Sequence, residues 1–247
     1  MINGQQFSYY RSNNTFAIFR PRDLPASRFL PEDNKVLNEL CERPQEGKRN
    51  KTVKREISAA LSAYFNKQSF HIYEFGSGYY PISSYFRDSV TFTYQGIDSD
   101  EHCIEELHRM NVPASNWATI TGQEPPHDKP SVATSVYAMH FMIDQDFADR
   151  IKLLTSADGF FIGNFYVDPG EMETGAERQR LRSILEQNSL YHIVLKDRNP
   201  NKASNEYWII GKADSVPAMH NFASAMQTAV AKHCDRKLEV KNTAELH

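Results

Sequence analysis

Residues 70–78 read Phe70-His71-Ile72-Tyr73-Glu74-Phe75-Gly76-Ser77-Gly78. The stretch is a short, largely apolar run that ends in small residues, which is typical of a buried strand followed by a tight turn. The two glycines let the backbone turn sharply and come close to a ligand, where a side chain would collide. The stretch therefore predicts a strand that carries a ligand-binding loop at its carboxyl end.

Helical and strand patterns alternate on both sides of this stretch. Apolar residues spaced three and four apart, from Val53 to Tyr64, predict a helix before it. After it, helices are predicted at 82–88, 101–110, 148–156, 175–188 and 217–234, and strands at 91–98, 116–121, 131–141, 159–167, 191–197 and 205–213. Such alternation indicates a parallel sheet with helices on both faces. The last two strands have no helix between them, so they are expected to pair as an antiparallel hairpin.

These patterns predict an α/β fold, namely a doubly wound, seven-stranded, mostly parallel sheet with an antiparallel terminal hairpin. Residues 53–213 form the predicted core, and residues 214–247 a C-terminal helix and tail. Residues 1–52 combine aromatic and basic side chains with several prolines, which indicates short helical or extended pieces joined by turns and an exposed loop from residue 41. This segment is expected either to cover a substrate or to pack on the edge of the sheet.

The composition favours a folded chain in a reducing compartment. Of 247 residues, 40% are hydrophobic and 24% charged, so a packed core is expected. A net charge of -3 disfavours a nucleic-acid partner, without excluding one, because phosphate binding needs a basic excess. The polar N-terminus and the lack of a long apolar run predict a cytoplasmic protein with no membrane partner. The separated cysteines and carboxylates show no metal spacing, so no metal is expected.

Two acids accompany the glycine loop. Glu74 ends the first strand, and Asp98 ends the next one, where an acid can accept hydrogen bonds from both hydroxyls of a ribose. Glu74 would repel a pyrophosphate but attract a cation. The third glycine of the dinucleotide motif G-x-G-x-x-G is also missing, because Tyr79 to Pro81 follow Gly78. The pattern favours S-adenosylmethionine, which carries an ammonium and a sulfonium.

At these positions the chain resembles the class I (Rossmann-like) S-adenosylmethionine-dependent methyltransferases. Glu74, Gly76 and Gly78 match the acid-x-Gly-x-Gly of their first motif, and Asp98 matches their ribose acid. The resemblance covers about residues 53–213 and implies that these four residues, together with Ser77 of the loop, bind the cofactor.

The resemblance extends to the later strands. Gln123 stands where many members carry an acid after the third strand, which implies a contact with the adenine amino group. Ser135-Val136-Tyr137-Ala138-Met139-His140-Phe141 is similar to the S-x-x-x-L-H-H stretch of small-molecule members. The implied reaction is methyl transfer to oxygen or nitrogen of a small molecule.

The candidate catalytic residues are His140 and Tyr137. An imidazole with a pKa near neutral could remove a proton from the acceptor, whereas the bland alternative is a histidine that only lines the site. Tyr137 is expected to line the site or to donate a hydrogen bond to the substrate. Further substrate contacts are predicted for Tyr9, Tyr10, Arg11, Asn164 and Tyr166.

Several alternatives stay open. An arginine-rich N-terminal face would favour an RNA acceptor, and a protein acceptor also fits. The fold could bind the cofactor and perform other chemistry or none. A nicotinamide oxidoreductase is disfavoured by Glu74 and the missing third glycine. The sequence leaves the oligomeric state undecided, with a homodimer as one option.

Overall fold

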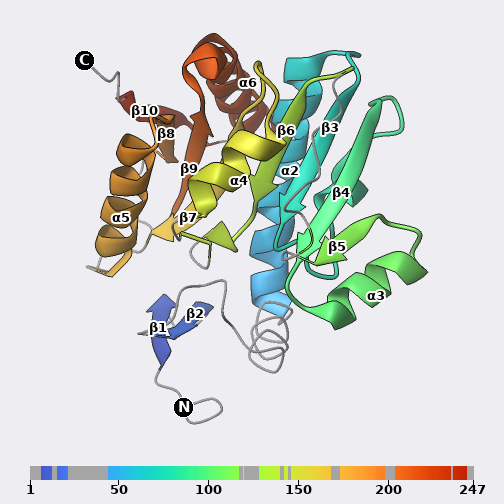
Figure 1. Ribbon diagram of the computed structural model, residues 1–247, viewed down its shortest axis with the longest axis horizontal. Coiled ribbons are helices and arrows are strands. Elements are labelled where there is room, and N and C mark those ends of the chain that lie inside the picture. Colours follow the sequence, from blue (N-terminus) through green and yellow to red (C-terminus); the bar gives the residue numbers. More distant parts are fainter. Residues whose placement is uncertain are drawn as a thin grey trace.

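The computed structural model describes residues 7–12, 16–21, 44–116, 119, 128–139, 142–143, 146–167, 173–197, 204–234 and 236–243. Within these ranges, eight strands form one sheet in the order β10-β8-β9-β7-β6-β3-β4-β5 (Figure 1). Five neighbouring strands run parallel, namely β3 (Phe70–Phe75), β4 (Phe92–Asp98), β5 (Ala114–Asn116), β6 (Ser131–Ser135) and β7 (Phe161–Val167).

The other strands are antiparallel to their neighbours. β9 (Ser204–Gly211) pairs antiparallel with both β7 and β8 (Tyr191–Asp197). The predicted mostly parallel sheet with an antiparallel terminal hairpin is therefore confirmed. The chain winds outward from β3 through β4 to β5, then returns to the other side of β3 with β6 and β7. In sheets of this type, ligands bind outside the carboxyl ends of the strands at such a reversal.

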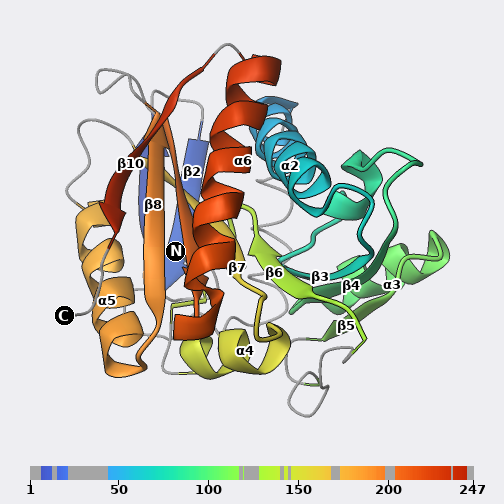
Figure 2. The ribbon, with the colours of Figure 1, turned by 90° about the horizontal axis from the view of Figure 1, so that it is seen from above.

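Helices cover both faces of the sheet (Figure 2). α2 (Pro44–Phe65) and α6 (Val216–Cys234) pack on one face, and α4 (Phe147–Leu154) and α5 (Glu173–Gln187) on the other. α3 (Glu101–Arg109) packs beside β4 and β5, and η2 (Ile82–Tyr85) and η5 (Ala213–Ser215) are short 3-10 helices. None of the helices in the described ranges is long and apolar enough to cross a membrane.

The C-terminal segment differs from the prediction of a helix and tail. After α6, the chain returns to the sheet as β10 (Leu238–Thr243), which pairs antiparallel with β8 and raises the strand count from seven to eight. The turn before β10 contacts helix α2, because Arg236 forms an ion pair with Glu56 of that helix. Tyr207 of β9 donates a hydrogen bond to the same carboxylate. One part-buried and one buried contact therefore join the last strand, the sheet and the first long helix.

The N-terminal segment contains a separate two-stranded antiparallel sheet. β1 (Phe7–Ser12) pairs with β2 (Phe16–Pro21) in a hairpin register that places Tyr10 opposite Ile18. In Figure 1 this hairpin lies beyond the carboxyl ends of the parallel strands, and the view of Figure 2 agrees. The predicted extended pieces are thus present, at the end of the sheet where a ligand is expected.

Several local predictions need correction, including the strand predicted at 131–141, which ends at Ser135. The helix before β3 begins at Pro44, inside the stretch expected to be an exposed loop. The helix predicted at 82–88 is only the four-residue turn Ile82–Tyr85, because Pro81 and a following extended residue confine it. The third strand is Ala114–Asn116 rather than 116–121. Each difference falls at an element boundary, where the apolar pattern carries least information.

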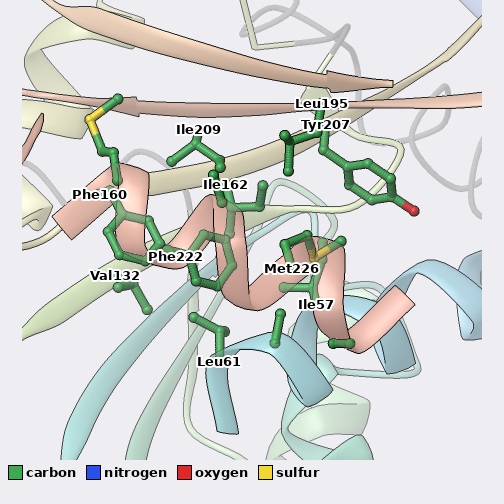
Figure 3. Packing of buried hydrophobic residues seen from close by; sticks show 14 of the residues in the cluster. Ile57, Leu61, Val132, Phe160, Ile162, Leu195, Tyr207, Ile209, Phe222 and Met226 are labelled. Atoms are coloured by element: carbon green, nitrogen blue, oxygen red, sulfur yellow. The ribbon is translucent and has the colours of Figure 1, made fainter. Parts of the chain in front are cut away.

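The larger core lies between the sheet and the pair α2 and α6. Figure 3 shows Ile57 and Leu61 of α2 facing Phe222 and Met226 of α6, with Ile162 and Ile209 of the sheet above them. The Phe222 ring lies 4.6 Å from that of Phe160 and is fully buried. Tyr207 lies at the margin of the labelled side chains in Figure 3, and its hydroxyl donates a hydrogen bond to Glu56.

We expect Phe222→Ala to lower the free energy of unfolding by about 3–5 kcal/mol, because the cavity adds to the lost transfer energy. Phe222→Leu keeps most of the apolar volume and should cost clearly less. Urea unfolding followed by circular dichroism measures both. A loss below about 1 kcal/mol for the alanine variant would contradict the packing described.

Two buried histidines lie near the starts of their strands, His71 in β3 and His192 in β8. The Nδ1 of His71 lies 2.6 Å from the Thr93 hydroxyl, and the His192 ring stacks on Trp208 with centroids 5.1 Å apart. Burial lowers the pKa of both side chains to about 4, with Lys129 adding to the effect at His71 and Arg182 at His192. Both imidazoles are therefore neutral in the folded protein near neutral pH.

A lowered folded-state pKa stabilises the protein above the unfolded value of 6.5, and that contribution is lost as the pH falls toward about 4. His192→Phe keeps a stacked ring that takes no proton. We expect wild type to lose about 1–3 kcal/mol more than this variant between pH 6.5 and 4. Denaturant titrations across this range test it, and parallel pH profiles would refute it.

Candidate functional site

The loop after β3 turns at two glycines with left-handed backbone angles. Gly76 has φ +64° and Gly78 has φ +57°, a region that other residues enter only with strain. A Cβ on Gly76 would lie 2.3 Å from the Cβ of Ala138, in the loop after β6. A Cβ on Gly78 would meet no described atom within 4 Å. Position 76 thus needs glycine for packing, whereas position 78 borders open space.

Asp98 connects the end of β4 to this loop. Its Oδ2 accepts a hydrogen bond from the Gly78 N–H at 2.9 Å, and its Oδ1 accepts one from the Asp100 N–H at 3.1 Å. Burial raises the pKa of the Asp98 carboxyl above its ordinary value, while these N–H donors oppose the rise. A carboxylate has about four acceptor sites, so capacity remains beyond its N–H donors. The structure thus brings together two residues predicted to bind the cofactor, with acceptor capacity left for ligand hydroxyls.

Glu74, which is predicted to attract a cationic ligand, has a cation of the protein beside it. Its side chain is fully buried, and its Oε2 accepts hydrogen bonds from the Ile82 N–H and the Tyr94 hydroxyl, each at 2.7 Å. Its Oε1 lies 2.8 Å from the ammonium of Lys54. The carboxylate is therefore already paired with a cation of the protein. Glu74 holds the loop in place, and its charge is met before any ligand arrives.

Ser77 lies at the tip of the loop and is buried. Its carbonyl accepts a hydrogen bond from Lys54 Nζ at 3.1 Å. The next aromatic residue, Tyr79, has its ring 6.1 Å from that of His102, at the start of α3. The loop therefore lies between helix α2 and helix α3, close to the end of β4.

Tyr137 belongs to a buried polar cluster at the ends of β6, β7 and β9. Its backbone is left-handed, with φ +57°, and its N–H donates to Asn164 Oδ1 at 2.9 Å. The Tyr137 hydroxyl donates to Asn205 Oδ1 at 2.7 Å, and Asn164 Nδ2 donates to the same oxygen at 3.0 Å. In this structure Tyr137 and Asn164 therefore bind each other and Asn205, and fix the loop after β6.

Other predicted site residues are only partly located. Gln123 and His140 lie outside the described residues, and so do the side chains of Tyr9, Tyr10, Arg11 and Tyr166. The backbones of these four residues belong to β1 and β7. Met139, next to His140, is buried in the core between the sheet and α4.

Two site residues escaped the sequence analysis. Lys54 lies on the helix that begins at Pro44, and Asn205 near the start of β9. Lys54 is followed by Ile57 and Leu61 on a buried helix face, which is a weak signal that a charge there has a partner. Asn205 acts on a residue 68 positions away and has no local signal.

Within the described ranges, no group of three or more histidine, cysteine or acidic side chains is arranged to hold a metal ion. Cys103 is buried beside Asp100. Burial, followed by the charges of Asp98 and Asp100, raises the pKa of its thiol. The thiol is therefore protonated near neutral pH and is a poor nucleophile.

Comparisons with known proteins connect this fold to a class. No family model and no curated protein matches the sequence. A probable spermidine synthase from Corynebacterium glutamicum superposes with a TM-score of 0.53 and 13% identity, covering 98% of this chain and 89% of its own. A putative S-adenosyl-L-methionine-dependent methyltransferase from Methanococcus maripaludis superposes with a TM-score of 0.52 and 13% identity, covering 75% and 94%.

The plantazolicin methyltransferase BpumL, in complex with a pentazolic desmethylPZN analog and SAH, gives a TM-score of 0.51 at 13% identity, covering 74% of this chain and 91% of that one. At such identities the likeness concerns the fold. The predicted class I methyltransferase architecture is confirmed on this basis, with β10 as an additional strand.

We expect Gly76→Ala to destabilise the protein by at least about 2 kcal/mol, because it combines left-handed strain with the collision at Ala138. Gly78→Ala is the matched control, since it meets only the strain and should cost about 1 kcal/mol. Adding Ala138→Gly to Gly76→Ala should recover part of the loss. Unfolding titrations compare the variants, and equal losses at positions 76 and 78 would contradict the assigned contact.

Proposed function

We propose that the chain binds S-adenosylmethionine at the carboxyl ends of β3 and β4 and transfers its methyl group to oxygen or nitrogen of a small molecule. The observation that carries the proposal is the Gly78–Asp98 hydrogen bond, which joins the glycine loop to an acid at the strand reversal of a methyltransferase fold. In sheets of this type, that position holds an adenosine ligand.

The residues present fit such a cofactor. Space is open beside Gly78, so the backbone can be approached closely there. A carboxylate offers about four acceptor sites, so Asp98 has capacity beyond its N–H donors, and ribose hydroxyls are the complementary donors. Hydroxyl donors would also stabilise the carboxylate, whose charged form is disfavoured by burial. We assign the ribose to Asp98 and the loop contacts to Gly76, Ser77 and Gly78.

When bound, the cofactor supplies an electrophilic methyl group on a sulfonium. Displacement at that carbon depends chiefly on the alignment of the acceptor, so the protein has to position the acceptor and to exclude water. The buried cluster around Tyr137 holds the loop after β6 at the same edge of the sheet. The hairpin β1–β2 lies beyond this edge, which supports the assignment of Tyr9, Tyr10 and Arg11 to the acceptor side.

The acceptor is assigned by its chemistry. A net charge of -3 favours a small molecule over an RNA backbone. His140, which follows the buried Met139, is proposed as the group that lines the acceptor site or takes a proton from the acceptor. We also propose a cytoplasmic location, in keeping with the three widely separated cysteines of the sequence.

A second candidate is the synthesis of a polyamine. The superposition with the probable spermidine synthase covers 98% of this chain, so it includes most of the N-terminal segment. The superpositions with the two methyltransferases cover about three quarters of this chain. Such a reaction would form a carbon–nitrogen bond on an amine and break a carbon–sulfur bond of a sulfonium donor. The mass gained by the product separates this transfer from methylation.

The test measures binding of S-adenosylhomocysteine and of an analogue without ribose hydroxyls, to wild type and to Asp98→Asn. If Asp98 binds the ribose, wild type should bind the analogue at least about tenfold more weakly, or about 1.4 kcal/mol. The asparagine variant should lose most of that difference, even if its loop is weakened. Calorimetry measures all four combinations.

If wild type and Asp98→Asn prefer S-adenosylhomocysteine over the analogue to the same extent, Asp98 does not bind the ribose. No binding of either ligand to folded wild type would overturn the proposed cofactor. Binding without transfer from S-adenosylmethionine to a panel of amines, phenols and carboxylic acids would leave a cofactor-binding protein of other function.

A further inference from the structure

The ammonium of Lys54 lies inside the glycine loop. It contacts the Glu74 carboxylate at 2.8 Å, the Ser77 carbonyl at 3.1 Å and the Tyr80 carbonyl at 2.6 Å. The Lys54 side chain is 6% exposed and that of Glu74 is fully buried. One cation therefore reaches three points of the segment 74–80 from helix α2.

Two of these contacts are hydrogen bonds, to the Ser77 and Tyr80 carbonyls, and the third is an ion pair with Glu74. An ammonium has three N–H donors, and three oxygens surround this one. Two of these oxygens are backbone carbonyls in the turn that follows Gly76, where no helix or sheet ladder supplies partners. The contact with the Ser77 carbonyl is buried, and a buried carbonyl without a donor costs free energy. Lys54 therefore does more than neutralise a buried acid, because it also satisfies the backbone of the turn.

We propose that Lys54 is the positioning residue of the cofactor loop, with its ammonium fixed at the place where the sequence alone suggested a ligand's cation. Glu74 holds the far end of the same segment through the Ile82 N–H. Between these two anchors, the Gly78 N–H is directed at Asp98. Lys54 thus acts on the ligand through the loop and does not touch it.

The competing explanation is that Lys54 only neutralises Glu74. Breaking a buried ion pair by removing one partner is strongly destabilising, so a single substitution cannot separate the two explanations. The double variant Lys54→Met with Glu74→Gln can. A glutamine oxygen still accepts from Ile82 or Tyr94, and no buried charge is left unpaired. Only the donors to the Ser77 and Tyr80 carbonyls are then missing.

The experiment compares wild type, K54M, E74Q and K54M/E74Q by two measurements. Hydrogen exchange of the segment 76–82 reports the loop in the ligand-free protein and needs no cofactor. Calorimetry with S-adenosylhomocysteine reports affinity, and this second readout rests on the proposed function. Lys51→Met is the matched control, since Lys51 lies one turn earlier and its ammonium lies 5.1 Å from the centroid of the exposed Tyr80 ring.

We expect K54M to unfold more easily, to exchange faster in this segment and to bind about tenfold more weakly or worse. K54M/E74Q should regain stability but keep the fast exchange and the weak binding. Where turnover is measured, KM for the cofactor should rise while kcat stays near wild type. K51M should resemble wild type in each measurement.

Recovery of slow exchange in the double variant would overturn the proposal and leave Lys54 as a counter-ion. If wild type binds no S-adenosylhomocysteine, the proposed function fails, but the exchange comparison still decides the role of Lys54.

Discussion

The buried carboxylate of Glu74 is the constraint on which the rest of the site depends. It lies where β3 ends, and its partners come from helix α2, strand β4 and the start of η2. A charge without partners in such a position costs several kcal/mol, so all three elements must be in place together. The path of the glycine loop is therefore linked to the docking of α2 on the sheet. The conformation of the glycine loop and the packing of α2 on the sheet therefore depend on each other.

Neighbouring loops at the carboxyl edge also constrain one another. Gly76 of the first loop leaves no room for a side chain against Ala138 of the second. The second loop is held in a left-handed turn at Tyr137, where the strain is offset by hydrogen bonds to Asn164 and Asn205. The two loops that would meet cofactor and acceptor are thus in direct contact. Pre-organised contacts of this kind reduce the ordering cost of binding.

The sequence allowed much of this to be predicted, and the limits have physical causes. Gly78 and Asp98 could be placed together because the ends of adjacent parallel strands lie at one edge of the sheet. Glu74 was predicted to attract a ligand's cation, and the sequence pattern did not show that a lysine twenty residues earlier lies beside it, on a helix whose charged residues look solvated. Asn205 and β10 depend on pairings across long stretches of chain, and the half-polar sequence LEVKNT has no strong strand pattern.

Strand β10 also changes what the protein presents at the margin of its sheet. β8 is largely buried along His192 to Leu195, whereas β10 exposes Glu239 and Lys241. An apolar strand with unpaired backbone groups is a template for pairing with another chain, and charged residues on the outermost strand oppose this. Among the described strands, β10 has no neighbour on its outer side. The added strand therefore acts as protection against edge-to-edge association of the folded protein at high concentration.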